Sequence, residues 1–157
     1  MKLPPFQALL DEHRADLYRF CVATAGWGEA DDCFQETWIA ALRAYPKLRN
    51  TRNPRAWLYR IAQNKAIDLQ RARGRRPVPV EAVEVGQAEP APPEFDGQSS
   101  PWAALRGLPP KQRTAVFCRT VLGMPYDELA ELLESTEEAA RRNVSEGLKK
   151  LREEWTA

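Results

Sequence analysis

The chain has 157 residues, of which 43% are hydrophobic, and a net charge of only +1, so it can form one domain or two small ones with a hydrophobic core. Its three well-separated cysteines and single histidine cannot make an ordinary Cys/His zinc site, so we expect no metal and expect the cysteines to be buried reduced thiols. There is no Gly-rich phosphate loop, no GxSxG motif, no signal peptide and no membrane-spanning run, so we expect a cytoplasmic protein that is not an enzyme and needs no cofactor.

The first predicted helix begins after Pro4 and Pro5 and runs for about five turns. Its apolar residues recur at helical spacing, at Phe6, Leu10, Leu17, Phe20 and Cys21. His13 lies at the edge of this apolar face, which favours a packed histidine over a metal ligand. Gly26 and Gly28 then predict a turn.

A second helix is predicted from about Glu29 to Tyr45. The residues expected to form its buried stripe are Phe34, Trp38, Ala41, Leu42 and Tyr45. Another stripe is polar apart from one member and contains Asp32, Gln35, Glu36 and Ile39. Acids near a helix start suit the helix dipole, which accounts for Asp32, but Glu36 is too far inside the helix for that explanation.

A loop from Pro46 to Pro54 leads into a long basic helix, predicted from Arg55 to Arg76. Its face for burial contains Leu58, Ile61, Ala62 and Leu69, while Arg60, Asn64, Asp68 and Arg71 lie on another face beside Trp57. Residues 43–76 contain eleven Lys and Arg against one acid, a local charge of +10, with Tyr45, Trp57 and Tyr59 interleaved. This pattern favours a nucleic-acid surface over an ordinary solvated helix face.

Residues 77–100 contain five Pro, five acids and no Lys or Arg. Such a segment cannot build a core, so we interpret it as a flexible linker and as the domain boundary. The helical halves on either side are expected to move semi-independently unless a partner holds them together.

Four further helices are predicted, over residues 102–107, 110–122, 125–133 and 136–155. Ser135 with Glu138 fits a capping box at the start of the last one. A short helix, a tight turn and a longer helix are typical of a helix-turn-helix, although a plain helical hairpin gives the same pattern. Inward-facing residues of the last helix are Ala140, Val144, Leu148, Leu151 and Trp155, and outward-facing ones are Glu137, Glu138, Arg141, Arg142, Ser145 and Lys149.

Three segments together resemble one family. ADDCFQETWIAALR is similar to region 2.2 of the group IV, or extracytoplasmic-function (ECF), sigma factors, PRAWLYRIAQNKAIDLQRAR to their region 2.4, and LPPKQRTAVFCRTVLGMPYDELAELL with the following helix to their region 4. The resemblance implies an all-α fold of two small helical domains. Residues 1–76 would form sigma region 2, 77–100 the flexible linker and 101–157 the helix-turn-helix domain of region 4.

The resemblance also implies a function. It indicates an alternative sigma factor that binds the β′ clamp and β flap of core RNA polymerase and directs the recognition and opening of promoter DNA. The implied polymerase-binding residues are Asp32, Gln35, Glu36 and Ile39. Those implied for the −10 element are Lys47, Arg49, Asn50, Arg52, Asn53, Trp57, Arg60, Asn64, Lys65 and Arg71. Those implied for the −35 element are Glu137, Glu138, Arg141, Arg142, Ser145 and Lys149.

The last helix departs from the family pattern. Its second and third turns commonly carry several bases, but here only Arg141 and Arg142 remain, Glu146 stands where a base is common, and Gly147 weakens the helix. Residues 101–157 have nine bases and nine acids, so no net charge attracts this half to DNA. The interpretation predicts weak binding to the −35 element.

Two other functions fit parts of the pattern. A sigma-like decoy would bind an anti-sigma protein and never touch DNA, but it would have no use for the local charge of +10. A stand-alone helix-turn-helix regulator would not need the polar face around Glu36. An anti-sigma factor is a further candidate partner of a true sigma factor, and an enzyme is the most distant alternative.

Overall fold

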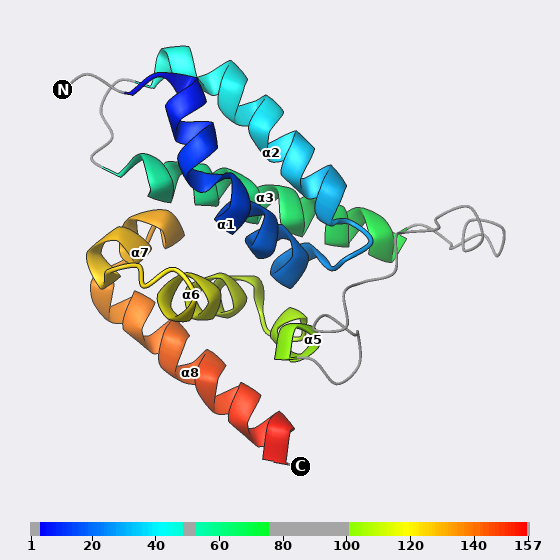
Figure 1. Cartoon of the computed structure of the whole chain (residues 1–157). Coiled ribbons are helices and arrows are strands. Elements are labelled where there is room, and N and C mark those ends of the chain that lie inside the picture. The colour runs from blue at the N-terminus through cyan, green and yellow to red at the C-terminus, as the bar shows by residue number, and fades with distance from the viewer. Residues whose placement is uncertain (1–3, 49–52, 76–100, 157) are drawn as a thin grey trace, which may run out of the picture.

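The computed structural model describes residues 4–48, 53–75 and 101–156, most of which lie in helices (Figure 1). The predicted linker and the candidate residues Arg49, Asn50 and Arg52 lie outside this part of the chain. The prediction of an all-α fold is confirmed. Within the described residues, no helix has the length and apolar character needed to cross a bilayer.

The N-terminal half, residues 4–75, is a bundle in which three α-helices pack against one another. The first helix starts directly after Pro5 and stops at Gly26. Gly26 has a φ of 91°, a backbone conformation that residues with a side chain rarely adopt. A short 3-10 turn follows the second helix. The elements are α1 (Phe6–Ala25), α2 (Ala30–Ala44), η1 (Tyr45–Lys47) and α3 (Pro54–Arg75).

The C-terminal half, residues 101–156, contains α5 (Pro101–Arg106), α6 (Pro110–Thr120), α7 (Tyr126–Leu133) and α8 (Glu137–Thr156). Helices α7 and α8 form the helix-turn-helix, with Glu134 in the left-handed conformation at the end of α7. The predicted capping box at Ser135 is wrong by one residue. The hydroxyl of Thr136 accepts the backbone N–H of Ala139 at 3.0 Å, because α8 begins one residue later than the sequence pattern suggested.

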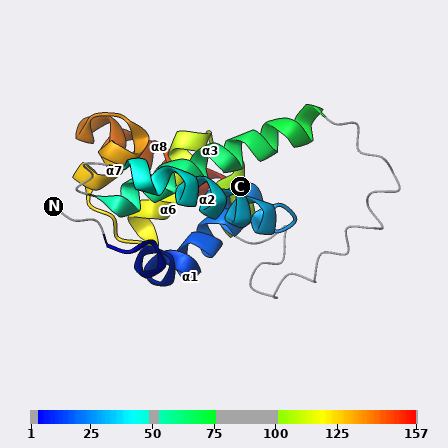
Figure 2. The ribbon, with the colours of Figure 1, turned by 90° about the horizontal axis from the view of Figure 1, so that it is seen from above.

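The two halves pack against each other and share one hydrophobic core (Figures 1 and 2). Helix α1 contacts α5 and α6, while α3 contacts α6 and α7. The ring of Phe20 on α1 meets the ring of Phe117 on α6 edge-on, with centroids 5.4 Å apart. The expectation of semi-independent halves therefore does not hold for this structure, because each half covers apolar side chains of the other.

Gly147 has a packing role that the sequence did not suggest. It lies on the buried side of α8, where a Cβ atom would come within 2.5 Å of Cγ2 of Val116 and 3.4 Å of the carbonyl oxygen of Gln112. Only glycine lets α8 approach α6 this closely, since the Val116 side chain is branched and cannot swing away. The packing of α6 on α8 accounts for a residue that weakens an isolated helix.

The Gly147→Ala variant should therefore be less stable than the native protein, by about 1–3 kcal/mol, because the added methyl overpacks the α6–α8 contact. Helix propensity alone predicts the opposite, a gain of about 1 kcal/mol. Urea unfolding followed by circular dichroism measures the difference. Gly28→Ala is the matched control, since a Cβ atom there meets open space and should leave the stability nearly unchanged. Equal midpoints for the two variants would contradict the packing role.

Candidate nucleic-acid interface

Helix α3 carries half of the residues predicted to contact the −10 element, and it is packed on more than one side. Leu58 and Ala62 are fully buried, as predicted, while Ile61 and Leu69 are partly buried. Helices α1 and α2 cover it from one half of the protein, and α6 and α7 cover it from the other. This leaves only part of its surface accessible.

Tyr59 is not part of an exposed aromatic surface, so its assignment among the interleaved aromatic residues is wrong. Its side chain is fully buried, and its ring meets that of Phe20 edge-on at 5.1 Å between centroids. Burial raises the pKa of its phenol. Tyr59 is a core residue because α1 and α6 both reach this side of α3, which periodicity within one helix cannot show.

The other residues predicted to contact the −10 element, on α3 and on the segment before it, form two groups. Asn64 and Arg71 are exposed, Trp57 and Lys65 are partly buried, and Lys47 is exposed on η1. The ring centroids of Trp57 and Tyr45 are 5.9 Å apart, so these two aromatic side chains form one cluster. Asn53 and Arg60 instead face α7 of the C-terminal half, where both make hydrogen bonds.

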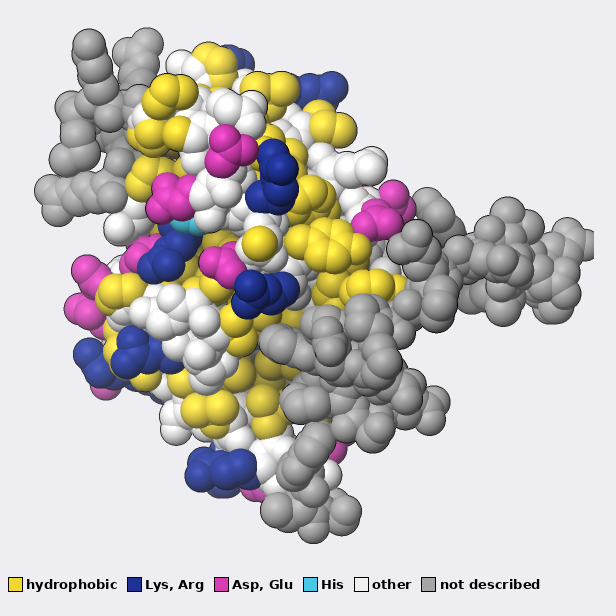
Figure 3. Space-filling model, viewed as in Figure 1, with side chains coloured by type: hydrophobic (Ala, Val, Ile, Leu, Met, Phe, Trp, Pro, Cys, Tyr) yellow, Lys and Arg dark blue, Asp and Glu magenta, His cyan; other side chains and the backbone are white. Residues whose placement is uncertain are grey.

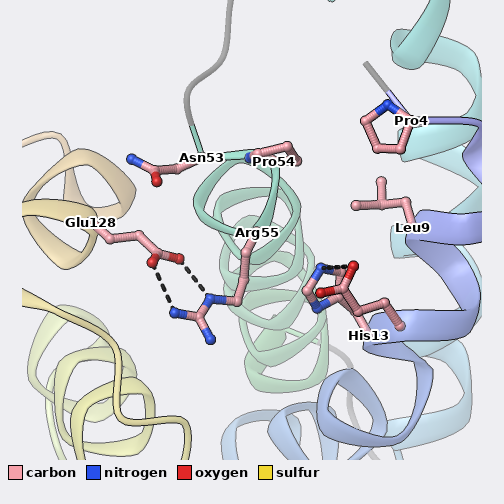
Figure 4. A pocket seen from close by; sticks show the side chains of 8 residues that line it. Pro4, Leu9, His13, Asn53, Pro54, Arg55 and Glu128 are labelled. Atoms are coloured by element: carbon pink, nitrogen blue, oxygen red, sulfur yellow. Dashed lines mark hydrogen bonds and ion pairs between the residues drawn. The ribbon is translucent and has the colours of Figure 1, made fainter. Parts of the chain in front are cut away.

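Arg55, a residue that the sequence analysis did not select, also contacts α7 and belongs to this second group (Figure 4). Its Nε and Nη2 atoms donate to the two carboxylate oxygens of Glu128 on α7, at 2.6 and 2.8 Å. These hydrogen bonds raise the pKa of Arg55. The partner lies 73 positions further along the chain, so no local pattern could have indicated the pair.

A pocket of about 270 Å³ opens beside this ion pair, between α1, the start of α3 and α7 (Figure 4). His13 lies in its wall and is buried, as predicted, with its Nε2 atom 3.9 Å from the carboxylate of Glu12. Burial lowers the pKa of His13. The complete lining is Pro4, Leu9, Glu12, His13, Asn53, Pro54, Arg55 and Glu128.

The exposed face of α2 forms a second candidate surface. Asp32, Gln35 and Glu36 are exposed, and Ile39 beside them is 49% exposed. Leu42 is 57% exposed, so its assignment to the buried stripe is wrong. The buried side of α2 consists of Ala30, Cys33, Thr37, Trp38 and Ala41.

Leu42 is therefore a functional candidate that the sequence analysis missed. It lies one helical turn after Ile39, and this spacing could have placed it on the same exposed face of the helix from the sequence alone. Two exposed aliphatic side chains next to three polar ones are typical of a protein-binding face.

The third candidate surface is α8, where all six predicted residues are exposed, namely Glu137, Glu138, Arg141, Arg142, Ser145 and Lys149. The guanidinium of Arg141 lies 4.3 Å from the ring centre of Tyr126 on α7. Glu146 accepts a hydrogen bond from Nε2 of Gln112 at 3.2 Å, so it helps to hold α8 on α6. On the face drawn in Figure 3, basic and acidic side chains lie intermixed rather than in a patch of one sign.

Two family models match the chain. The model of Sigma-70 region 2 matches residues 9–76, and the model of Sigma-70 region 4 matches residues 102–151. The ECF RNA polymerase sigma factor SigD of Mycobacterium tuberculosis is 34% identical over 161 aligned residues, which cover 95% of this chain and 76% of SigD. SigG of the same organism is 30% identical over 157 residues, covering 82% of this chain and 42% of SigG.

Solved structures share the fold. The sigma factor RpoE of Bartonella quintana, solved in complex with the anti-sigma factor NepR, superposes with a TM-score of 0.71 at 21% identity, covering 96% of each chain. CnrH in complex with the cytosolic domain of CnrY gives a TM-score of 0.65 at 25% identity, covering 94% of this chain and 84% of CnrH. The arrangement of helices in both halves is thus one already known.

The burial of Tyr59 predicts how its substitutions behave. Tyr59→Phe should change the free energy of unfolding by less than about 0.5 kcal/mol, because the phenol oxygen has no hydrogen-bond partner among the described residues. Tyr59→Ala should lose about 3–5 kcal/mol through the cavity it leaves. Chemical denaturation measures both. If Tyr59→Ala kept its stability and lost only nucleic-acid binding, Tyr59 would be a surface residue after all.

Proposed function

Because the chain belongs to the extracytoplasmic-function group of the sigma-70 family, we propose that it is an alternative sigma factor that binds core RNA polymerase and directs promoter recognition and opening. The observation that carries the proposal is the match of region 2 and region 4, in that order, with a 34% identical ECF sigma factor aligned over 95% of the chain. Its partners are core polymerase and promoter DNA. We assign it no catalysis of its own and place its action in the cytoplasm, where polymerase works.

We assign the binding of core polymerase first to the exposed face of α2. Asp32, Gln35 and Glu36 would pair with basic groups on the β′ clamp, and Ile39 and Leu42 would supply the apolar contact. Two observations support this assignment: all five side chains are exposed on one helix, and that helix packs mainly on α1 and α3 of its own half. A buried apolar centre with a polar surround is the usual anatomy of a protein interface.

We assign the −10 element to residues 47–53 and the accessible side of α3. Asn64 can hydrogen-bond a base edge, Trp57 can stack on a base, and Arg60, Lys65 and Arg71 can hold phosphates. Unpairing and unstacking a base to flip it out costs a few kcal/mol. A pocket for the base and protein contacts to the DNA backbone must offset this cost. The concentration of charge supports this role, since residues 43–76 carry +10 while the whole chain carries +1.

We assign the −35 element to α8, with Arg141 and Arg142 as its main cations. Residues 1–76 then form the domain for polymerase and the −10 element, residues 77–100 connect the domains, and residues 101–157 form the domain for the −35 element and the β flap. The balance of nine bases and nine acids in the last segment supports a secondary contribution to affinity. Region 2 would supply most of the binding and region 4 mainly the position.

The polymerase assignment predicts that Glu36→Lys weakens binding to core polymerase at least about tenfold, because it places like charges together at an interface. Fluorescence anisotropy with labelled protein and core polymerase measures the affinity. Asp11→Lys on the exposed side of α1 makes the same change of charge and should bind nearly as well as the native protein. Equal affinities for both variants, with native circular dichroism, would refute the assignment.

The division of DNA binding predicts the response to salt. Removing Arg60, Lys65 and Arg71 together should flatten the log–log salt dependence of promoter binding by roughly two units, since each phosphate contact to single-stranded DNA contributes about 0.7. Removing Arg141 and Arg142 should flatten it less and alter the preference among −35 sequences. A salt titration of polymerase–promoter complexes, on a promoter found by run-off transcription from a library, makes the comparison. A larger loss for the Arg141/Arg142 variant would reverse the assigned roles.

A further inference from the structure

The contact between α3 and α7 is built from charge-assisted hydrogen bonds rather than from apolar packing alone. Arg55 and Glu128 form a bidentate pair, with side chains 30% and 11% exposed. Such fork-to-fork pairs are among the strongest hydrogen-bonded contacts between side chains, because both bonds involve charged groups. The pair lies at the first turn of α3, directly after the loop assigned to the −10 element.

The end of α7 adds a second anionic contact one turn further along α3. Arg60 donates to the backbone carbonyls of Glu131 and Leu132, and its Nε atom lies 3.6 Å from the carboxylate of Glu134. Both carbonyls belong to the last turn of α7, which ends where Glu134 turns left-handed with φ of 53°. The Glu131 carbonyl also accepts the backbone N–H of Glu134 at 3.2 Å, so Arg60 uses its second lone pair. The negative end of the helix dipole therefore faces the guanidinium.

A third contact joins the loop itself to α7. The side-chain amide of Asn53 donates to the carboxylate of Glu131 at 2.6 Å. Along its edge toward α3, α7 thus presents carboxylates at Glu128, Glu131 and Glu134, together with two carbonyls. All of these are oxygen acceptors, as phosphate oxygens are, and their partners are cations or an amide donor.

We propose that α7 is an internal competitor of promoter DNA. In the closed form seen here, its acidic edge occupies Asn53, Arg55 and Arg60, and DNA can bind at the start of α3 only after the two halves separate. The inference rests on the proposed function for the role of Asn53 and Arg60 in DNA binding. It adds Arg55 to the DNA-binding residues and gives α7 a regulatory role.

The dimensions of the promoter require such a separation. A compact chain of this length has a radius of gyration of about 15 Å. Elements about 25 base pairs apart lie on the order of 85 Å apart along B-DNA. The 24 residues of segment 77–100 reach at most about 80 Å when extended, which is of the right order to join two separated halves. The closed form therefore cannot hold both elements, and the α3–α7 contact must break when both are bound.

Compaction of the full-length free protein tests the contact without DNA. Small-angle X-ray scattering should give a larger radius of gyration for Glu128→Arg and for Arg55→Glu than for the native chain. The double variant with both substitutions should be compact again, because the pair is restored with exchanged charges. The milder Glu128→Gln, with circular dichroism as the folding check, should also expand the molecule. Variants as compact as the native chain would overturn the proposal.

Competition is tested with a fluorescein-labelled, mixed-sequence, 20-nucleotide DNA single strand and the full chain without polymerase. Glu128→Gln should bind this strand about tenfold more tightly than the native protein, since it frees the cations without adding a contact. Asp127→Asn removes the same charge from the neighbouring exposed position of α7 and should change the affinity less than about twofold.

Each result of this comparison bears on the proposal. Equal gains for Glu128→Gln and Asp127→Asn would show a general charge effect and overturn it. An expanded Glu128→Gln with unchanged affinity for the strand would overturn the competition with DNA. Run-off transcription with core polymerase then separates the two proposals, because a native chain that still initiates transcription keeps the proposed function even when the internal competitor is refuted.

Discussion

Helix α3 has to satisfy two requirements that conflict, and much of the structure follows from this conflict. It holds the largest concentration of positive charge in the chain, yet it also supplies Leu58, Tyr59 and Ala62 to the shared core. A helix that is buried on several sides has little surface left for a ligand. The closed form pairs the cations Arg55 and Arg60 at the start of α3 with oxygen atoms of α7, so that both charges have acceptors where they are partly buried.

The same conflict explains why the two halves do not lie apart. Phe20 and Phe117 touch across the boundary, and Arg113 on α6, almost completely buried, donates to the side chain of Gln70 on α3 at 2.9 Å. Burial lowers the pKa of Arg113, so this charge is held at some cost. An interface that combines apolar packing with a costly buried cation is well suited to a contact that forms in one state and breaks in another.

The C-terminal half shows a related compromise between packing and recognition. Glu146 and Gly147 depart from the pattern of a basic recognition helix, and both serve the contact between α8 and α6, through Gln112 and Val116. The two residues that depart from a basic recognition helix are thus residues that fix the position of α8. This agrees with the proposal that region 4 sets register on the promoter while region 2 supplies most of the affinity.

The sequence by itself determined the helices and their order, because periodicity, Pro and Gly act locally: Pro5 and Gly26 bound α1, and the six outward-facing residues of α8 are exposed. It also determined the family, through three segments. Only the tertiary structure decided that Tyr59 is buried and Leu42 exposed, since each depends on which helices cover a given side. It alone paired Arg55 with Glu128, because the attraction between two charges depends on their distance in space and leaves no trace in the spacing of residues 73 positions apart.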